Sequence, residues 1–265
     1  MSLAIDEIET EVLADPEASA PSALREKPAL VYIPIVIVLS GLLLWLYVSN
    51  VDMISQESTP LNWSKKLQPQ IIQHIQLTVA STAIVLAVAI PTGIALTRPV
   101  ARKFSPPVLW IANVGQSFPA YGLFVVAYMW IGRGFLPSVL ALAFFSTLPV
   151  LRNTMVGIDQ VDKAVIEAGR GMGLTRFQAL RSIELPLAVP VMLAGVRTAL
   201  IINVGMAALA FLIGGGGLGV TISAGLKLQQ NLVIITGAAL TAILALTIDW
   251  IAAMAEQFLR PKGLK

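Results

Sequence analysis

This 265-residue chain has few of the side chains that usually carry catalysis, and their scarcity excludes most catalytic classes. Cysteine is absent, so disulfides, thiolate metal sites and thiol catalysis are excluded. His74 is the only histidine, which also removes a metal site built from several histidines. The glycine run GGGGLG at 214–219 lacks the Lys-Ser/Thr pair that completes a phosphate-binding Walker loop, so a backbone turn is the better interpretation. We therefore expect no catalytic residue, metal or cofactor on this chain.

The segment EAGRGMGLTRFQALRSIELP, residues 167–186, concentrates charge in a chain that is only 12% charged and 56% hydrophobic. Thr175 and Gln178 have the spacing of a capping box, which predicts a helix that starts at 175, while Pro186 is expected to end it. Gly173 lies where two short helices could meet. The predicted helix carries an apolar stripe formed by Phe177, Leu180 and Ile183. So short a helix is marginal alone, and its stripe requires either a partner protein or the lipid surface.

The elements that must position this segment are predicted to be membrane spans. The mean hydropathy is +0.80, and apolar runs are long enough to cross a hydrocarbon core of about 30 Å. The sequence predicts an all-α membrane protein of about six transmembrane helices, at 29–49, 71–97, 107–131, 135–158, 187–213 and 231–259. The third is the weakest, because Asn113, Gln116, Ser117 and Pro119 interrupt it.

The distribution of Lys and Arg predicts the orientation of these spans. If the N-terminus is cytoplasmic, the inner segments hold thirteen of these residues and the outer loops hold four. Both termini and the charged segment are then cytoplasmic. Residues 1–24 are acidic and contain neither Lys nor Arg, so no secretory signal is expected. We expect residues 1–28 to be a disordered cytoplasmic tail, with a short docking helix as the alternative.

Several polar side chains fall inside the predicted spans. Arg197 and Asp249 have equal predicted depth on consecutive spans, so they could pair; alternatively, Arg197 reaches headgroups and Asp249 contacts water. His74 is expected to be satisfied locally, with a proton relay as the alternative. Asn113 and Gln116 suit either helix–helix hydrogen bonds or a substrate path. Two aromatic residues beside them could face a quaternary ammonium group or lipid, namely Phe118 and Tyr121.

The charged segment resembles the EAA loop of the permeases of ATP-binding-cassette (ABC) importers. The family pattern is E-A-A, three residues, G, nine residues, I-x-L-P, and here it reads EAG at 167–169, Gly173 and IELP at 183–186. Gly169 in place of the second alanine is the one departure, a small-for-small change. The similarity extends over LPVLRNTMVGIDQVDKAVIEAGRGMGLTRFQALRSIELPLAVPVMLAGVRTA, residues 148–199, and covers about 70–260. This part of the chain is similar to permeases of osmoprotectant importers, which carry glycine betaine, choline and carnitine.

The resemblance implies a fold like that of type I importer permeases, with 163–186 as a cytoplasmic coupling loop in a core at 70–260. The implied coupling residues are Glu167, Ala168, Gly173, Leu185 and Pro186, to which the apolar stripe and the helix rim add Arg176, Phe177 and Leu180. The implied partners are a pair of ATP-binding subunits that hold ATP and magnesium, a second permease copy or paralogue, and an extracytoplasmic solute-binding protein. The bilayer of the bacterial cytoplasmic membrane surrounds the chain. A net charge of +3 is no argument for nucleic acid.

Other functions remain open at this level. A permease for another small solute, such as methionine, shares the EAA loop. An ion-coupled secondary transporter is expected to carry several intramembrane carboxylates, whereas the interior of the spans, away from their ends, supplies only Asp249. A membrane scaffold that recruits cytosolic partners without transport is the third alternative.

Overall fold

In a computed structural model, the structure describes residues 23–51 and 55–259, and every regular element in these ranges is a helix. The long helices are α2 (Ala23–Asn50), α4 (Gln68–Leu96), α7 (Phe135–Asp159), α10 (Leu185–Ala207) and α12 (Asn231–Leu259). The shorter α-helices are α3 (Ser55–Ser58), α5 (Ser105–Ser117), α6 (Ala120–Ile131), α8 (Lys163–Gly171), α9 (Arg176–Ala179) and α11 (Gly219–Leu228). Two π-helical turns, Trp63–Leu67 and Leu180–Glu184, and two 3-10 turns, Arg102–Phe104 and Ala210–Ile213, join them.

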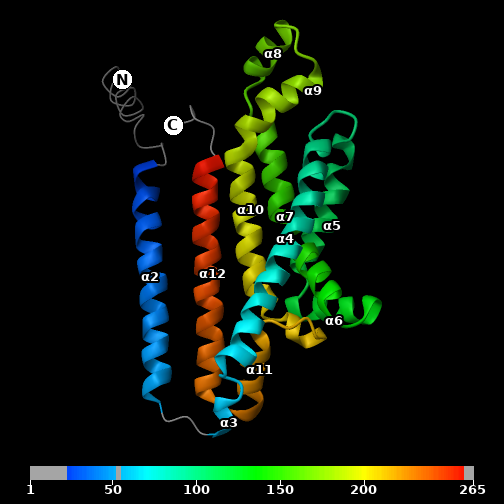
Figure 1. The fold of residues 1–265 in the computed structure, drawn as a ribbon. Coiled ribbons are helices and arrows are strands. Elements are labelled where there is room, and N and C mark those ends of the chain that lie inside the picture. Colours follow the sequence, from blue (N-terminus) through cyan, green and yellow to red (C-terminus); the bar gives the residue numbers. More distant parts are fainter. Residues whose placement is uncertain (1–22, 52–54, 260–265) are drawn as a thin grey trace, which may run out of the picture.

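Five of the long apolar segments are able to cross a membrane, or six if the bent pair α5 and α6 counts as one span. α2 starts and α12 ends at the end of the bundle where α8 and α9 lie, and α3 and α11 lie at the opposite end (Figure 1). The charged hairpin therefore lies at the same end of the bundle as the first and last described residues. The predicted acidic tail falls mostly on residues 1–22, outside the described residues, and α2 already begins at Ala23.

The third expected span differs from the structure in its course, and the fifth differs at its C-terminal end. The third is no straight helix, because α5 and α6 meet at an angle of 105°. Phe118 is extended at the break, since the following Pro119 lacks an N–H and disfavours a helical residue before it. The helix face that carries Asn113 and Gln116 therefore does not continue into α6. The fifth span ends at Ala207 rather than at 213, where a 3-10 turn and the glycine run follow.

The core forms where α7 packs between α4 and α10. Small residues bring these backbones close together, as in many membrane bundles. A Cβ on Gly93 of α4 would lie 2.8 Å from the Thr154 side chain of α7, and one on Gly195 of α10 would lie 2.6 Å from the Cβ of Asn153. Phe124 of α6 is fully buried in the same core. Because α7 packs on α4, α10, α5 and α6, it positions the broken helix and the two long helices that flank the charged hairpin.

Helix α2 lies at one edge of the bundle, beside α12 (Figure 1). The indole Nε1 of Trp250 donates a hydrogen bond of 3.0 Å to the carbonyl oxygen of Leu30. None of the most apolar 18-residue window of α2 is buried. Its exposed apolar side chains, such as Leu43 and Trp45, are suited to lipid.

Candidate functional site

The charged segment folds as a hairpin of two short helices, α8 and α9. Asp162 caps α8 by accepting a hydrogen bond of 2.8 Å from the Ala164 N–H. Gly173 has φ +95°, a backbone conformation that only glycine adopts without strain, and it turns the chain between the helices. The expected capping box is present: Thr175 Oγ1 accepts from the Gln178 N–H at 3.3 Å, and Gln178 Oε1 accepts from the Thr175 N–H at 2.8 Å. The predicted start of the second helix is confirmed.

The apolar stripe divides into an exposed and an internal part. Phe177 is 70% exposed and Leu180 is half-buried, so these two side chains are open to a partner. Ile183 instead packs on α8, where its Cδ1 occupies the space that a Cβ on Gly169 would need. Gly169 is buried in this contact, so glycine at this motif position lets Ile183 approach α8 closely.

Pro186 does not end the helix, contrary to the prediction. The chain passes from α9 through the π-helical turn Leu180–Glu184 into α10 without a break. Leu185 keeps helical angles of φ −63° and ψ −49°, and its N–H bonds the Leu180 carbonyl. Pro186 stands in the first turn of α10, directly after the π-helical turn, where the hydrogen-bond pattern changes from π to α. The hairpin is thus continuous with a membrane-length helix from Arg176 to Ala207.

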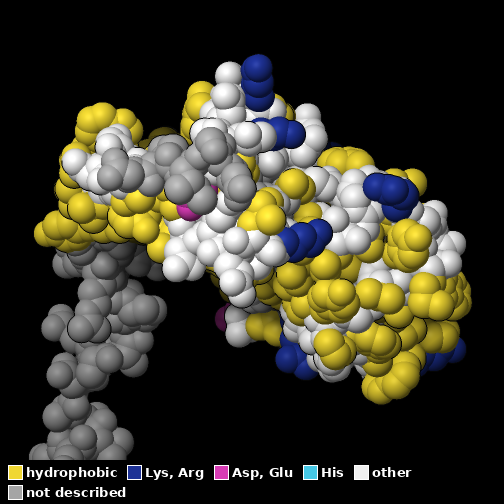
Figure 2. Space-filling model, turned by 90° about the horizontal axis from the view of Figure 1, so that it is seen from below, with side chains coloured by type: hydrophobic (Ala, Val, Ile, Leu, Met, Phe, Trp, Pro, Cys, Tyr) yellow, Lys and Arg dark blue, Asp and Glu magenta, His cyan; other side chains and the backbone are white. Residues whose placement is uncertain are grey.

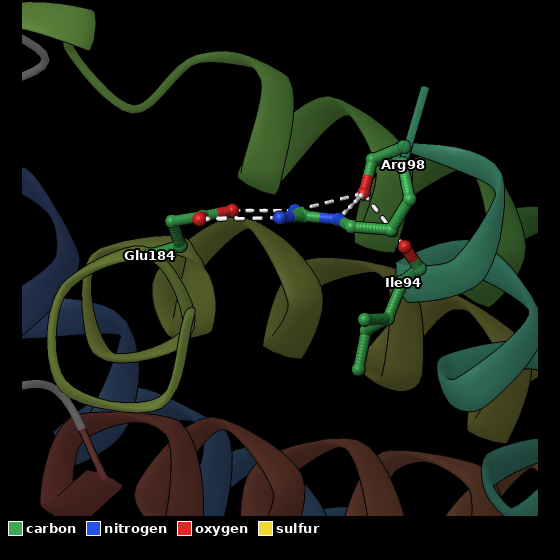
Figure 3. A network of polar contacts seen from close by, with 4 residues as sticks. Ile94, Arg98 and Glu184 are labelled. Carbon is green, nitrogen blue, oxygen red and sulfur yellow. Dashed lines mark hydrogen bonds and ion pairs between the residues drawn. The ribbon is translucent and has the colours of Figure 1, made fainter. Parts of the chain in front are cut away.

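A buried carboxylate joins this continuous helix to α4. Glu184 is 6% exposed, and both of its oxygens accept hydrogen bonds from Arg98 in the turn after α4, with Nη1 and Oε1 3.2 Å apart. Thr97 Oγ1 accepts from Arg98 Nε and Nη2 at 3.2 and 3.0 Å and donates to the Ile94 carbonyl at 2.7 Å (Figure 3). This pair is not predicted from the sequence. Arg98 counts there only as one of the cytoplasmic cations, and Glu184 is the unspecified residue x of the I-x-L-P motif. Their 86-residue separation leaves no local signal of the pair.

Above this ion pair lies a crevice of about 490 Å³ between the turn after α4 and the α8–α9 hairpin. Its lining includes Arg170 of α8 and Arg176 and Phe177 of α9, with Val100 on the opposite side. Glu167 and Ala168 are exposed on α8 beside it. The arrangement offers cationic and apolar groups to a partner and no nucleophile or acid–base pair.

Comparison with known proteins identifies the family of this bundle. The protein-family model described as "Binding-protein-dependent transport system inner membrane component" matches residues 89–261. The chain belongs to this family. Its relatives include the glycine betaine/carnitine/choline transport system permease protein OpuCB of Bacillus subtilis, which is 40% identical over 193 residues, 73% of this chain and 88% of the relative. The choline transport system permease protein OpuBB of the same organism is 42% identical over the same shares.

A solved structure of the inward-facing MetNI methionine ABC transporter shares the fold of this permease. The TM-score is 0.66 at 24% identity, over 79% of this chain and all of that chain. The expected all-helical fold of a type I importer permease is confirmed. The protein is a multi-pass inner-membrane component of a bacterial ABC importer, a class of transport system that also includes an ATPase and a binding protein.

The permease carries a second ion pair within its membrane-spanning part. Arg197 of α10 donates to both carboxylate oxygens of Asp249 of α12, with distances of 2.6 Å from Nε and 2.9 Å from Nη2. The Arg197 side chain is 35% exposed and that of Asp249 is 18% exposed. The depth argument from sequence thus leads to two residues that are in direct contact.

The polar and aromatic residues of the expected substrate path lie at the break between α5 and α6. Asn113 and Gln116 are half-buried on α5, whereas Phe118 and Tyr121 are 42% and 59% exposed. Phe124, an aromatic residue further along α6, is enclosed in the core and offers no ring face to a ligand. Two half-buried polar residues thus precede the break and two exposed rings lie at or just after it.

At the opposite end of the permease, the glycine run packs on α4. His74 is fully buried; its Nε2 lies 2.8 Å from the Val204 carbonyl and its Nδ1 lies 3.4 Å from the Leu218 N–H. No histidine colour is visible on this end face, where Lys and Arg stand apart among hydrophobic side chains (Figure 2). His74 is therefore satisfied by the backbone, as expected, and the glycine run forms a turn.

Proposed function

We propose that this chain is the permease subunit of an importer for quaternary ammonium osmoprotectants such as glycine betaine, choline and carnitine. The observation that carries the proposal is the similarity to OpuCB and OpuBB of B. subtilis, at 40 and 42% identity over 193 residues. OpuCB is named as a permease for all three solutes, and OpuBB is named as a permease for choline. A methionine permease is the competing function, but the likeness to the methionine transporter, at 24% identity, concerns the fold.

In this proposal, the α8–α9 hairpin is the coupling element at the cytoplasmic end and both termini are cytoplasmic. Phe177 and Leu180 fill a groove of an ATP-binding subunit, while Glu167 and Arg176 contact its rim. Ala168 and Gly173 allow the close turn, and Leu185 and Pro186 carry the movement into α10. The support is that Phe177 is exposed on a helix that continues without a break into a membrane-length segment.

Transport then follows from rigid-body movement of packed helices. Two ATP-binding subunits hold ATP and magnesium and close on each other, and the hairpins of two permease chains, identical or paralogous, move with them. A separate extracytoplasmic binding protein delivers the solute. Residues 70–260 form the moving core, and α2 (Ala23–Asn50) is an added span whose first residue follows the cytoplasmic N-terminal segment.

The solute path in this proposal passes the break between α5 and α6. Phe118 and Tyr121 present ring faces, which attract quaternary ammonium groups by about 0.5–2 kcal/mol per contact. Asn113 and Gln116 supply hydrogen-bonding groups to the carboxylate or hydroxyl end of such a solute. The exposure of both rings at a helix break supports this assignment.

The experiment is reconstitution of the permease in vesicles with its ATP-binding subunit and binding protein, followed by uptake of labelled glycine betaine, choline, carnitine and methionine. ATP-dependent uptake of at least one quaternary ammonium solute is expected. Uptake of methionine alone would refute the solute class, and absence of any ATP-dependent uptake would favour a scaffold.

The same vesicles test the coupling element with Phe177→Ala and a matched control. We expect Phe177→Ala to weaken binding of the ATP-binding subunit by about 30-fold, the effect of losing about 2 kcal/mol at an interface hot spot. Phe258→Ala is the control, because Phe258 is 82% exposed near the end of α12. Equal binding by both variants would show that the hairpin is not the coupling element.

A further inference from the structure

The crevice beside the α8–α9 hairpin has the size and lining of a binding site. Its volume of about 490 Å³ lies within the range of about 300–1,000 Å³ that is usual for ligand pockets, so it can hold several side chains. Val100, in the turn after α4, is 85% exposed on one side, and Phe177 is 70% exposed on the other. Two apolar groups thus flank an open, unfilled space.

The electrostatics of the crevice favour an anionic group. Three of its lining residues are arginines, namely Arg98, Arg170 and Arg176, and its only carboxylate is Glu184. Glu184 already receives hydrogen bonds from Arg98 on both oxygens. Within residues 23–51 and 55–259, no carboxylate lies within ion-pair distance of Arg170 or Arg176. Two guanidinium groups therefore remain to bind a carboxylate, for which their planar, forked geometry is suited.

The position of the crevice favours a protein from the cytoplasm over a lipid headgroup. One wall is the α8–α9 hairpin, which projects past the ends of α2, α12 and the α4–α5 turn (Figure 1). A ligand between the hairpin and the turn therefore lies at or beyond the level where the membrane-length helices end.

We propose that the crevice binds a segment of the ATP-binding subunit that carries an Asp or Glu beside an apolar side chain. The carboxylate pairs with Arg170 and Arg176, and the apolar side chain packs between Val100 and Phe177. This inference rests on the proposed function and extends the coupling surface from the hairpin to the turn at 98–100. The bound segment contacts the Arg98–Glu184 pair, which joins α4 to α10, and so it acts on both helices at once.

The first test is charge reversal, measured as binding of the purified ATP-binding subunit to the permease in nanodiscs. We expect Arg170→Glu and Arg176→Glu each to weaken binding by about 10-fold or more, since reversing one partner of an interfacial charge pair adds repulsion. Arg170→Gln is expected to weaken binding less and to reduce its salt dependence. Arg181→Glu is the matched control, because Arg181 is exposed on the adjoining π-helical turn and does not line the crevice.

The second test identifies the occupant with a photoreactive group attached at Val100→Cys, in a chain that has no other cysteine. We expect cross-links to a peptide of the ATP-binding subunit that contains Asp or Glu. Cross-links only to phosphatidylglycerol in the same nanodiscs would overturn the proposal in favour of a lipid headgroup. If Phe177→Ala abolishes binding while the charge reversals match Arg181→Glu, the crevice proposal fails and the coupling function stands. If Phe177→Ala is also without effect, both fail.

Discussion

Removing one member of the Arg197–Asp249 pair should destabilise the permease more than removing both. The guanidinium of Arg197 makes two short hydrogen bonds to the carboxylate, at 2.6 and 2.9 Å, between α10 and α12. Arg197 lies twelve residues into α10, or about 18 Å from its start, well inside a hydrocarbon core of about 30 Å. Asp249→Asn keeps the shape of the side chain and removes the negative charge that receives both of these hydrogen bonds.

The expected magnitude follows from the burial of the two side chains. Breaking a buried ion pair costs about 3–5 kcal/mol, and a charge at a span centre costs about 2.5–3.5 kcal/mol. The Arg197 side chain is 35% exposed and can still reach water or headgroups, which reduces the cost. We therefore expect Asp249→Asn to lower the free energy of unfolding by about 2 kcal/mol. The double variant Arg197→Gln/Asp249→Asn should lose less than about 1 kcal/mol, because both charges of the pair are removed together.

The assay is unfolding by SDS in mixed micelles for the wild type, both single variants and the double variant. Arg181→Gln is the control, since it makes the same change on an exposed arginine and should leave stability unchanged. The reasoning would be refuted if the loss in the double variant equalled the sum of the two single losses to within about 0.5 kcal/mol. Such additivity means that the residues do not interact.

Two further expectations concern topology and packing. Ser182→Cys should react with an impermeant thiol reagent only in inside-out membranes, and Ser58→Cys only in intact cells. Both serines are exposed, and their elements lie at opposite ends of the bundle. The reverse labelling pattern would show that the orientation is the opposite of the one predicted. Gly195→Val should lower the free energy of unfolding by about 1–3 kcal/mol, because its Cβ would lie 2.6 Å from that of Asn153. Gly41→Val is the control and should have little effect, because no atom lies within 4 Å of a Cβ at this position. Equal stability of the two variants would contradict the packing of α7 on α10.

Much of the site could be predicted because its signals are local. The capping box of Thr175 and Gln178 and the turn at Gly173 depend on residues within one helical turn. The prediction that Pro186 ends the helix was wrong, because it considered only the local preference of the residue before proline. The rule for residues before proline describes isolated dipeptides, but here a π-helical turn shifts the hydrogen bonds so that Pro186 stands in the first turn of α10.

The sequence by itself determined which segments are apolar enough to cross a bilayer, because a crossing requires about 20 apolar residues, and its Lys and Arg predict which side is cytoplasmic. It also placed Arg197 and Asp249 at one depth, since depth follows from the 1.5 Å rise per residue. Only the tertiary structure decided how each helix is rotated about its own axis and which helix lies closest to it. That rotation turned Ile183 onto Gly169, buried Phe124 and opened the arginine-lined crevice. It also brought Arg98 to Glu184 across 86 residues, because side-chain packing between helices, unlike hydropathy, depends on residues far apart in the chain.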